Sequence, residues 1–293
     1  MSTRATIAIL SVAAALLLTS IAPHAQAANP GDLLKVAITY LDGYATRVSG
    51  VSLEEHYTIT DVSGGRMSTP QHLTSDVVLL NLAGKVIALR DAYAIDNNPL
   101  RERQPRIISL LTQPTTEKWD QAQTYAAETF RRMKSELIAT LNEPTLALQF
   151  LTPENRSKVT FKLDGKKKFD GVETQGLGFR EPKNLTGSYI MKTRGKALAS
   201  GRLWTDPITG RIHQTELWLQ STSETVRITV TYARDAALDV WLPSLMVDDY
   251  QTSDRTGEFS NMGAGGYNAS RAFECRGTYS NPRYTPIDLS VSR

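Results

Sequence analysis

Residues 226–232 read Val-Arg-Ile-Thr-Val-Thr-Tyr, and this short segment carries the clearest strand signal in the chain. Its apolar residues occupy every second position, with an arginine and two threonines between them. Side chains of a strand point alternately to opposite faces, so the pattern predicts one buried face and one wet face. Such half-buried strands are typical of antiparallel sheets that cover a core on one side.

Strand-like segments recur on both sides of residues 226–232. Turn signals separate them at hairpin spacing, the strongest being Asp-Pro-Ile-Thr-Gly at 206–210. This succession predicts a meandering antiparallel sheet rather than a βαβ fold. The strands are expected at residues 51–60, 77–82, 86–95, 159–163, 172–179, 189–191, 199–205, 212–220, 226–232, 240–250, 259–262 and 267–275.

Helical periodicity appears before the first expected strand and again in a block at about 105–151. A first helix is expected from Asp32, with Tyr40 and Tyr44 as an aromatic stripe that packs in the core. Within the block, short helices are expected at 107–111 and 144–151, and a long amphipathic helix at 119–137. We expect this long helix to cap the sheet formed after Ser157, which gives an α+β fold with helices on one curved sheet.

The first 27 residues have the pattern of an export signal. Arg4 precedes an apolar run at 7–18, and Ala-Gln-Ala at 25–27 is a small-x-small cleavage pattern. The run is too short to span a membrane, and no second run of spanning length follows. We therefore expect a signal peptide at 1–27, a single β-rich domain at 28–293, and an exported protein that is periplasmic or secreted and not integral to a membrane.

Composition is consistent with a globular protein and excludes some partners. Hydrophobic residues make up 41% of the chain, enough for a substantial core, and the formal net charge is only +3. This charge gives no electrostatic footprint for nucleic acid, and the basic run at 166–168 is expected to be a solvated hairpin tip. Cys275 is the one cysteine, so no internal disulfide can form and we expect a buried, inert thiol.

A search for catalytic motifs gives negative results. His56, His72 and His213 have no metal-ligand spacing, and neither a G-x-S-x-G elbow nor a Walker-type loop is present. The acid pairs at 54–55 and 248–249 lie on strands, where neighbours point to opposite faces. The sequence thus predicts no enzyme, no metal and no cofactor. An exported hydrolase is the least favoured alternative, because it requires His56 or His213 to meet acids in the fold.

Charged residues concentrate between Arg90 and Arg106. Two interpretations stay open: an ion-pair network at a strand-to-helix junction, or arginines that bind an anionic head group or a partner protein. The arginines that would make this contact are Arg90, Arg101, Arg103 and Arg106.

Residues 201–211, Gly-Arg-Leu-Trp-Thr-Asp-Pro-Ile-Thr-Gly-Arg, are similar to a hairpin of the form G-x-x-W-x-D-P-x-T-G. That hairpin belongs to the outer-membrane lipoprotein carrier superfamily of LolA- and LolB-like proteins, which Leu242-Pro243 also resembles. Residues 89–104 further resemble a group of uncharacterised secreted bacterial proteins. The resemblance implies a half-open antiparallel β-barrel whose concave side is closed by helices.

These observations favour a binding protein that carries or senses a lipid, a lipoprotein acyl chain or another hydrophobic ligand. Apolar burial supplies about 0.8 kcal/mol per methylene without any catalytic group. The alternative is a protein-interaction or sensor module with the same fold and a filled core, because every candidate wall residue also fits plain core packing. These wall residues are Trp119, Phe130, Met133, Leu203, Leu217, Leu219, Val226, Ile228, Val230 and Trp241.

Overall fold

The computed structural model describes residues 29–133, 136–190, 197–252, 270–287 and 289. The expected signal peptide at 1–27 and the expected strand at 259–262 lie outside these residues. The helices are α1 (Pro30–Val48), α2 (Arg106–Leu111), α3 (Thr116–Phe130) and α4 (Glu136–Leu141), with 3-10 turns η1 (Ser63–Gly65) and η2 (Leu146–Leu151).

The strands form one 11-stranded antiparallel sheet in the order β4-β3-β2-β1-β11-β10-β9-β8-β7-β6-β5. Pairing of β1 with β11 joins the N-terminal strands to the meander of the second half. The sheet is open, with β5 at one end and β3 and β4 at the other, so the predicted α+β fold with an open antiparallel sheet is confirmed. The strands are β1 (Val51–Asp61), β2 (Gln71–Leu82), β3 (Lys85–Ile95), β4 (Asn98–Pro99), β5 (Thr160–Phe169), β6 (Val172–Arg180), β7 (Leu198–Thr205), β8 (Ile212–Gln220), β9 (Glu224–Asp235), β10 (Val240–Thr252) and β11 (Arg271–Tyr284).

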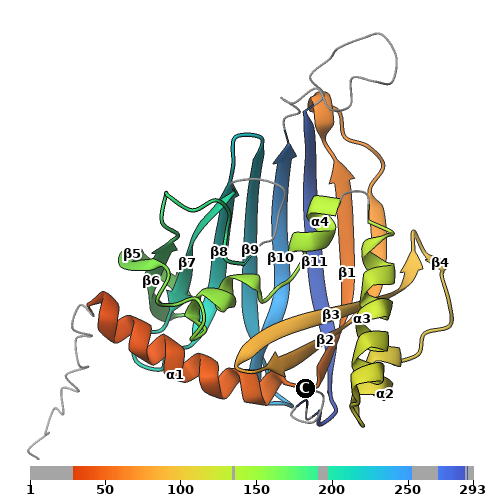
Figure 1. Ribbon diagram of the computed structural model, residues 1–293, viewed down its shortest axis with the longest axis horizontal. Helices are drawn as coiled ribbons and strands as arrows, with labels where there is room; N and C mark the ends of the chain where they lie inside the picture. Colours follow the sequence, from red (N-terminus) through yellow and green to blue (C-terminus); the bar gives the residue numbers. More distant parts are fainter. Residues whose placement is uncertain (1–28, 134–135, 191–196, 253–269, 288, 290–293) are drawn as a thin grey trace, which may run out of the picture.

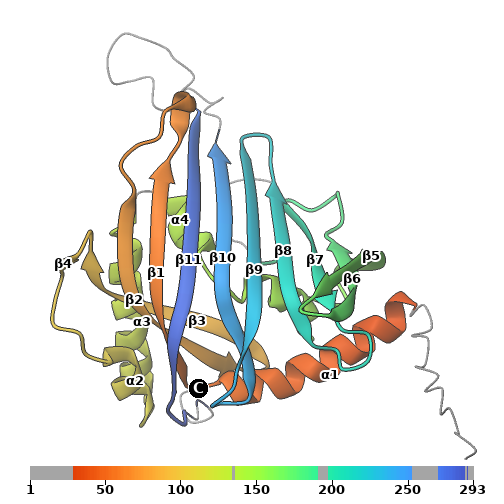
Figure 2. The same ribbon diagram turned by 180° about the vertical axis from the view of Figure 1, so that it is seen from behind.

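The sheet is strongly coiled, and its two faces are covered differently. Figure 1 shows β3 crossing in front of the central strands, with α1 across their lower ends and α4 in front of them. Figure 2, from behind, shows strands β8 to β11 and β1 in the foreground. The main core lies on the inner side, where the alternating residues of β9 pack with α1, α4 and η2.

The strand β2 is apolar on both faces. Val77 and Leu79 belong to the main core, whereas Val78 and Leu80 belong to a second cluster with α2 and α3. Neighbouring residues of a strand point to opposite faces, so α2 and α3 pack on the outer face of the N-terminal strands. The expectation that residues 119–137 cap the sheet formed after Ser157 is therefore wrong for α3.

Three local predictions also need correction. The helix expected at 119–137 is interrupted, because α3 ends at Phe130. There the Arg132 amide donates a hydrogen bond to the Thr129 carbonyl, three residues back, and this bond closes the last turn. The basic run at 166–168 is part of β5 and is not a hairpin tip; the chain turns instead at Asp170 and Gly171, which have positive φ. The expected strand at 189–191 is a turn at 189–190.

The outer edge of β3 is covered by side chains instead of a long neighbouring strand. The Thr129 hydroxyl accepts from the Ala92 amide at 2.9 Å and donates to the Arg90 carbonyl at 3.2 Å. Further along, Glu143 accepts from the Ala88 amide and the Thr145 hydroxyl donates to the Val86 carbonyl. The segment from α3 to η2 thus satisfies the backbone groups that an edge strand leaves unpaired.

We predict that Thr129→Val lowers the free energy of unfolding by about 1–3 kcal/mol, because it leaves a buried amide without an acceptor. Chemical denaturation of the two proteins measures the difference. Thr124→Val is the matched control, since the Thr124 hydroxyl bonds only within its own exposed helix turn. Equal stability of the two variants would contradict the edge-covering role of Thr129.

Candidate functional site

The helix α1 spans the gap between the two ends of the open sheet. Asn29 caps its start by accepting from the Asp32 amide at 2.9 Å, and buried residues recur along one side at helical spacing. This side contacts β2 and β3 near one end of the sheet and β5 and β6 at the other. α1 therefore acts as a cover over the inner face, held by contacts from both ends.

The hairpin at 201–211 fixes one side of α1. Gly210 has a φ of 72°, and a Cβ at this position would lie only 2.1 Å from the Val36 carbonyl oxygen. A glycine is thus required both by the turn and by the close approach of α1. Asp206 shapes the turn by accepting from the Ile208 amide and the Thr209 hydroxyl. Burial alone would raise the pKa of Asp206, but these hydrogen bonds hold it below its usual value.

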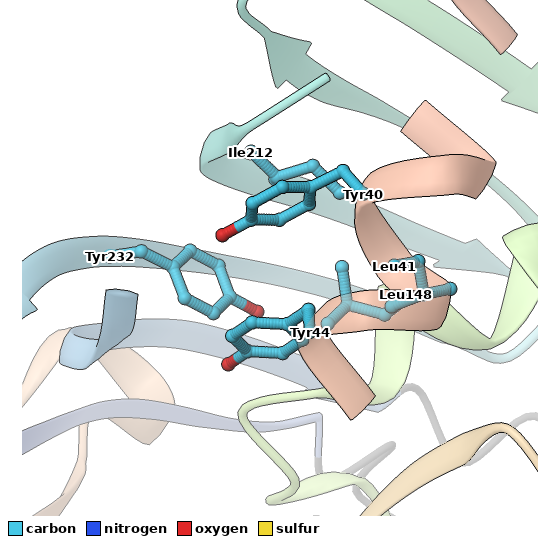
Figure 3. A pocket seen from close by; sticks show the side chains of 6 residues that line it. All are labelled: Tyr40, Leu41, Tyr44, Leu148, Ile212 and Tyr232. Carbon is cyan, nitrogen blue, oxygen red and sulfur yellow. The ribbon is translucent and has the colours of Figure 1, made fainter. Parts of the chain in front are cut away.

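A narrow apolar pocket with a volume of only about 10 Å³, roughly the space of one water molecule, lies between α1 and the inner face of the sheet. Figure 3 shows the side chains around it, which come from four different elements. Aliphatic carbons and phenol rings form the whole lining, so the pocket suits an apolar group. The lining residues are Tyr40, Leu41 and Tyr44 of α1, Leu148 of η2, Ile212 of β8 and Tyr232 of β9.

The three phenols of the pocket have different hydrogen-bonding states. The Tyr232 hydroxyl donates to the Pro144 carbonyl at 2.9 Å. The Tyr44 hydroxyl is buried and has no partner among the described residues. A buried hydroxyl without a partner costs about 1–3 kcal/mol, and such groups are commonly completed by water or a ligand. Tyr44 thus contributes a buried hydroxyl without a hydrogen-bond partner among the described residues.

Tyr40 lies half-buried at the mouth of the pocket. Burial raises its pKa to about 12, and the charges of Arg47 and Arg211 partly oppose this rise. The Arg47 guanidinium carbon lies 6.0 Å from the centre of the Tyr40 ring. The mouth is therefore the positively charged end of an otherwise apolar site.

Most of the wall residues predicted from the sequence lie in the main core on the inner face. There Leu203, Leu217, Leu219, Val226, Ile228, Val230 and Met133 are buried, and Trp241 is partly buried against them. Trp119 lies apart, in the second cluster with α2 and α3. The side chain of Phe130 is outside the described part. None of these residues lines the pocket beneath α1, so their role as a ligand-binding wall stays a prediction.

The helical spacing of Tyr40 and Tyr44 predicts core packing for both rings but does not predict a pocket. Their spacing of four residues on one helix is a signal of a shared face, but it does not show what the face opposes. The rings stack with centroids 5.7 Å apart, as this spacing allows. Ile212 and Tyr232 join them only because the sheet coils under α1.

The arginines between Arg90 and Arg106 neutralise a row of acids. Strand register places Glu54, Asp76 and Asp91 side by side on the outer face of β1, β2 and β3, an arrangement that is destabilising for like charges. Arg103 bridges the first two at 2.7 Å each, and both Arg101 and Arg106 pair with Asp91. The geometry corresponds to the ion-pair interpretation of this cluster, and binding of an anion or partner there stays a prediction.

Arg90 lies on the other face, in the core. It pairs with Glu55 and also donates to the Asn142 carbonyl at 2.7 Å and to its side-chain oxygen at 2.9 Å. Glu55 and Asp248 are fully buried, whereas their neighbours Glu54 and Asp249 are not, as strand alternation predicts. Arg90 therefore fixes the end of α4 to the inner face.

Asp248 is a buried acid near the middle of the same face. The Tyr57 hydroxyl donates to it at 2.5 Å, and burial raises the pKa of Asp248 to about 6. Cys275 lies opposite it on β11 and is buried, as the sequence predicts; burial and the Asp248 charge both raise the pKa of the thiol.

The histidines are spread over the sheet. His56 and His72 lie on the adjacent strands β1 and β2, whereas His213 is buried on β8 between Phe169 and Trp241. Within the described residues, no group of three or more His, Cys, Asp or Glu side chains is placed to hold a metal ion. Among the helices described above, none combines the length and apolarity needed to cross a membrane.

We predict that Tyr44→Phe leaves the free energy of unfolding unchanged or raises it by up to about 1 kcal/mol, because it removes a hydroxyl that lacks a protein partner. Tyr232→Phe is the matched variant and should lower this free energy by about 1 kcal/mol, since it removes the bond to Pro144. Thermal and chemical unfolding measure both. An equal loss in the two variants would show that the Tyr44 hydroxyl is bonded.

A second prediction concerns pH. The native pKa of Asp248, about 6, exceeds the unfolded value of about 3.9, so the native state binds more protons between these pH values. Its contribution to stability is therefore present in acid and is lost as the pH rises through 6. Asp248→Asn should gain roughly 2 kcal/mol relative to wild type between pH 4 and pH 7. Asp249→Asn, on the outer face, is the control and should not show this pH-dependent gain.

No family model and no curated protein matches the chain. A domain from Vibrio parahaemolyticus, provisionally named as an outer membrane lipoprotein-sorting protein, matches at 10% identity over 89% of this chain and 95% of that one, with a TM-score of 0.42. A DUF1329 family protein from Desulfovibrio piger matches at 11% identity over 91% and 98%, with a TM-score of 0.41.

A LolA superfamily protein from Nitrosomonas europaea also matches, at 11% identity over 91% of this chain and 98% of that one, with a TM-score of 0.32. That protein carries the name of the superfamily whose hairpin residues 201–211 resemble. At 10 and 11% identity they concern the fold alone, and the fold described above stands on the strand order and register of the chain itself.

Proposed function

We propose that this protein is a non-enzymatic binding protein that takes an apolar chain, such as a lipid acyl chain, into the pocket beneath α1. The observation that carries the proposal is the lining of this pocket, which consists of aliphatic and phenol side chains. Aliphatic and phenol side chains favour apolar ligands, and this lining offers no nucleophile or acid–base pair.

The arrangement of α1 supports an entry route. α1 lies at the start of the described chain and contacts strands near both ends of the open sheet. A displacement of α1 would widen the pocket without breaking a strand pair. Apolar burial of about 0.8 kcal/mol per methylene would then supply the affinity.

We infer that the protein acts outside the cytoplasm, in the periplasm or as a secreted protein. The pattern of residues 1–27 supports this inference. The resemblance of residues 201–211 to the lipoprotein carrier hairpin supports the same setting.

A second candidate function is a sensor or protein-interaction module that uses this fold without a ligand. The pocket volume favours it, because about 10 Å³ holds roughly one water molecule and is far below the roughly 300–1,000 Å³ typical of small-molecule sites. The two candidates differ in one property, namely whether the space beneath α1 takes up an apolar probe.

We predict that the protein binds N-phenyl-1-naphthylamine, a dye that fluoresces in apolar surroundings, and that Ile212→Trp weakens this binding at least about tenfold. The indole would fill the pocket, because Ile212 is one of its lining residues. A fluorescence titration measures the dissociation constants. Native mass spectrometry of protein purified without detergent gives a second readout for bound lipid.

Leu34→Trp is the matched control, since Leu34 packs on the core from α1 but does not line the pocket. It should bind the dye as the wild type does. If the wild type takes up no dye and no lipid, the binding function is refuted. If Ile212→Trp and Leu34→Trp bind equally well, the dye occupies another place.

A further inference from the structure

We propose that the ligand of this pocket is a single-chain amphiphile with an acidic head group, held at the mouth by Arg47 and Arg211. This inference rests on the proposed function and names the class of ligand.

The two arginines lie at the open side of the pocket. Both exert their charge on the phenol of Tyr40, the half-buried residue of the lining. Arg47 belongs to the last turn of α1 and is exposed. Arg211 follows the Gly210 turn and lies over the Trp241 ring, with its guanidinium carbon 4.9 Å from the ring centre. They come from the two elements that meet at the mouth.

Neither guanidinium has a carboxylate or hydrogen-bond partner within the part of the chain that the structure describes. The acids near Arg211 are already engaged. Asp206 accepts from its own turn, and Asp239 forms an ion pair with Arg234 at 2.7 Å. Arg47 and Arg211 also help to lower the pKa of Asp239, but neither forms an ion pair with it in the described part of the chain, so both keep free donors beside an apolar pocket.

This combination selects for a particular chemistry. The pocket interior excludes charge, so an ionised group cannot enter it without a large desolvation cost. An anionic head can instead stay in water at the mouth and bond to the arginines while its apolar chain lies inside. A carboxylate on an unbranched alkyl chain has both the anionic head for the arginines and the apolar chain for the pocket. A cationic amphiphile has the apolar chain, but its head group is repelled by the arginines.

Three ligands with the same chain test the proposal: dodecanoate, 1-dodecanol and dodecyltrimethylammonium, each below its micelle concentration. Displacement of N-phenyl-1-naphthylamine from the full protein gives their affinities. We expect dodecanoate to bind at least about tenfold more tightly than dodecanol, and the cation to bind most weakly. Raising the salt concentration should weaken dodecanoate and leave dodecanol unchanged.

The double variant Arg47→Gln, Arg211→Gln should lose about tenfold in dodecanoate affinity and keep its affinity for dodecanol. Arg202→Gln is the matched control, because Arg202 of β7 is paired with Asp164 of β5 at 2.8 Å, and it should change neither affinity. Similar affinity for all three ligands, with no effect of salt or of the double variant, would overturn the head-group assignment and leave the pocket as a binding site. Failure of all ligands and of the dye would instead refute the proposed function.

Discussion

An open antiparallel sheet has two edges, and the backbone groups of those edges need partners. This constraint shapes the rest of the molecule. At the β3 edge, the segment from α3 to η2 supplies the partners through Thr129, Glu143 and Thr145. At the other edge, β5 exposes lysines at 162 and 166–168, and edge lysines discourage pairing with another chain.

The helices that cover the inner face are attached by different kinds of contact. The segment after α3 is tied to the edge by Thr129 and to the inner face by the buried Arg90–Glu55 pair with Asn142. Breaking one partner of such a buried pair is strongly unfavourable, so this segment is fixed. α1 is held differently, mainly by apolar packing and by the close approach of Gly210. The cover over the pocket is thus attached by apolar packing, without a buried ion pair of the Arg90–Glu55 kind among the described residues.

Much of this fold follows from the sequence, and the failures have physical causes. Alternation at 226–232 predicts β9, and Asp-Pro-Ile-Thr-Gly predicts the turn before β8. The helical periodicity of 119–137 shows that an apolar face exists but not which surface covers it. The missing signal is the run Val-Val-Leu-Leu at 77–80, since a continuous apolar run indicates a strand buried on both faces. The pocket could not be predicted, because four elements separated in sequence meet there only through the coiling of the sheet.

The arginines of this protein show why residue type alone does not identify a charged site. Arg101, Arg103 and Arg106 form the denser cluster in sequence. Strand register nevertheless places a row of acids opposite them, and ion pairs with these acids neutralise their charge. Arg47 and Arg211 are far apart in sequence and show no pattern. They keep their charge because the acids near Arg211 are held by a turn and by Arg234. Pairing set by the fold, rather than the density of arginines, therefore decides where positive charge is left for a ligand.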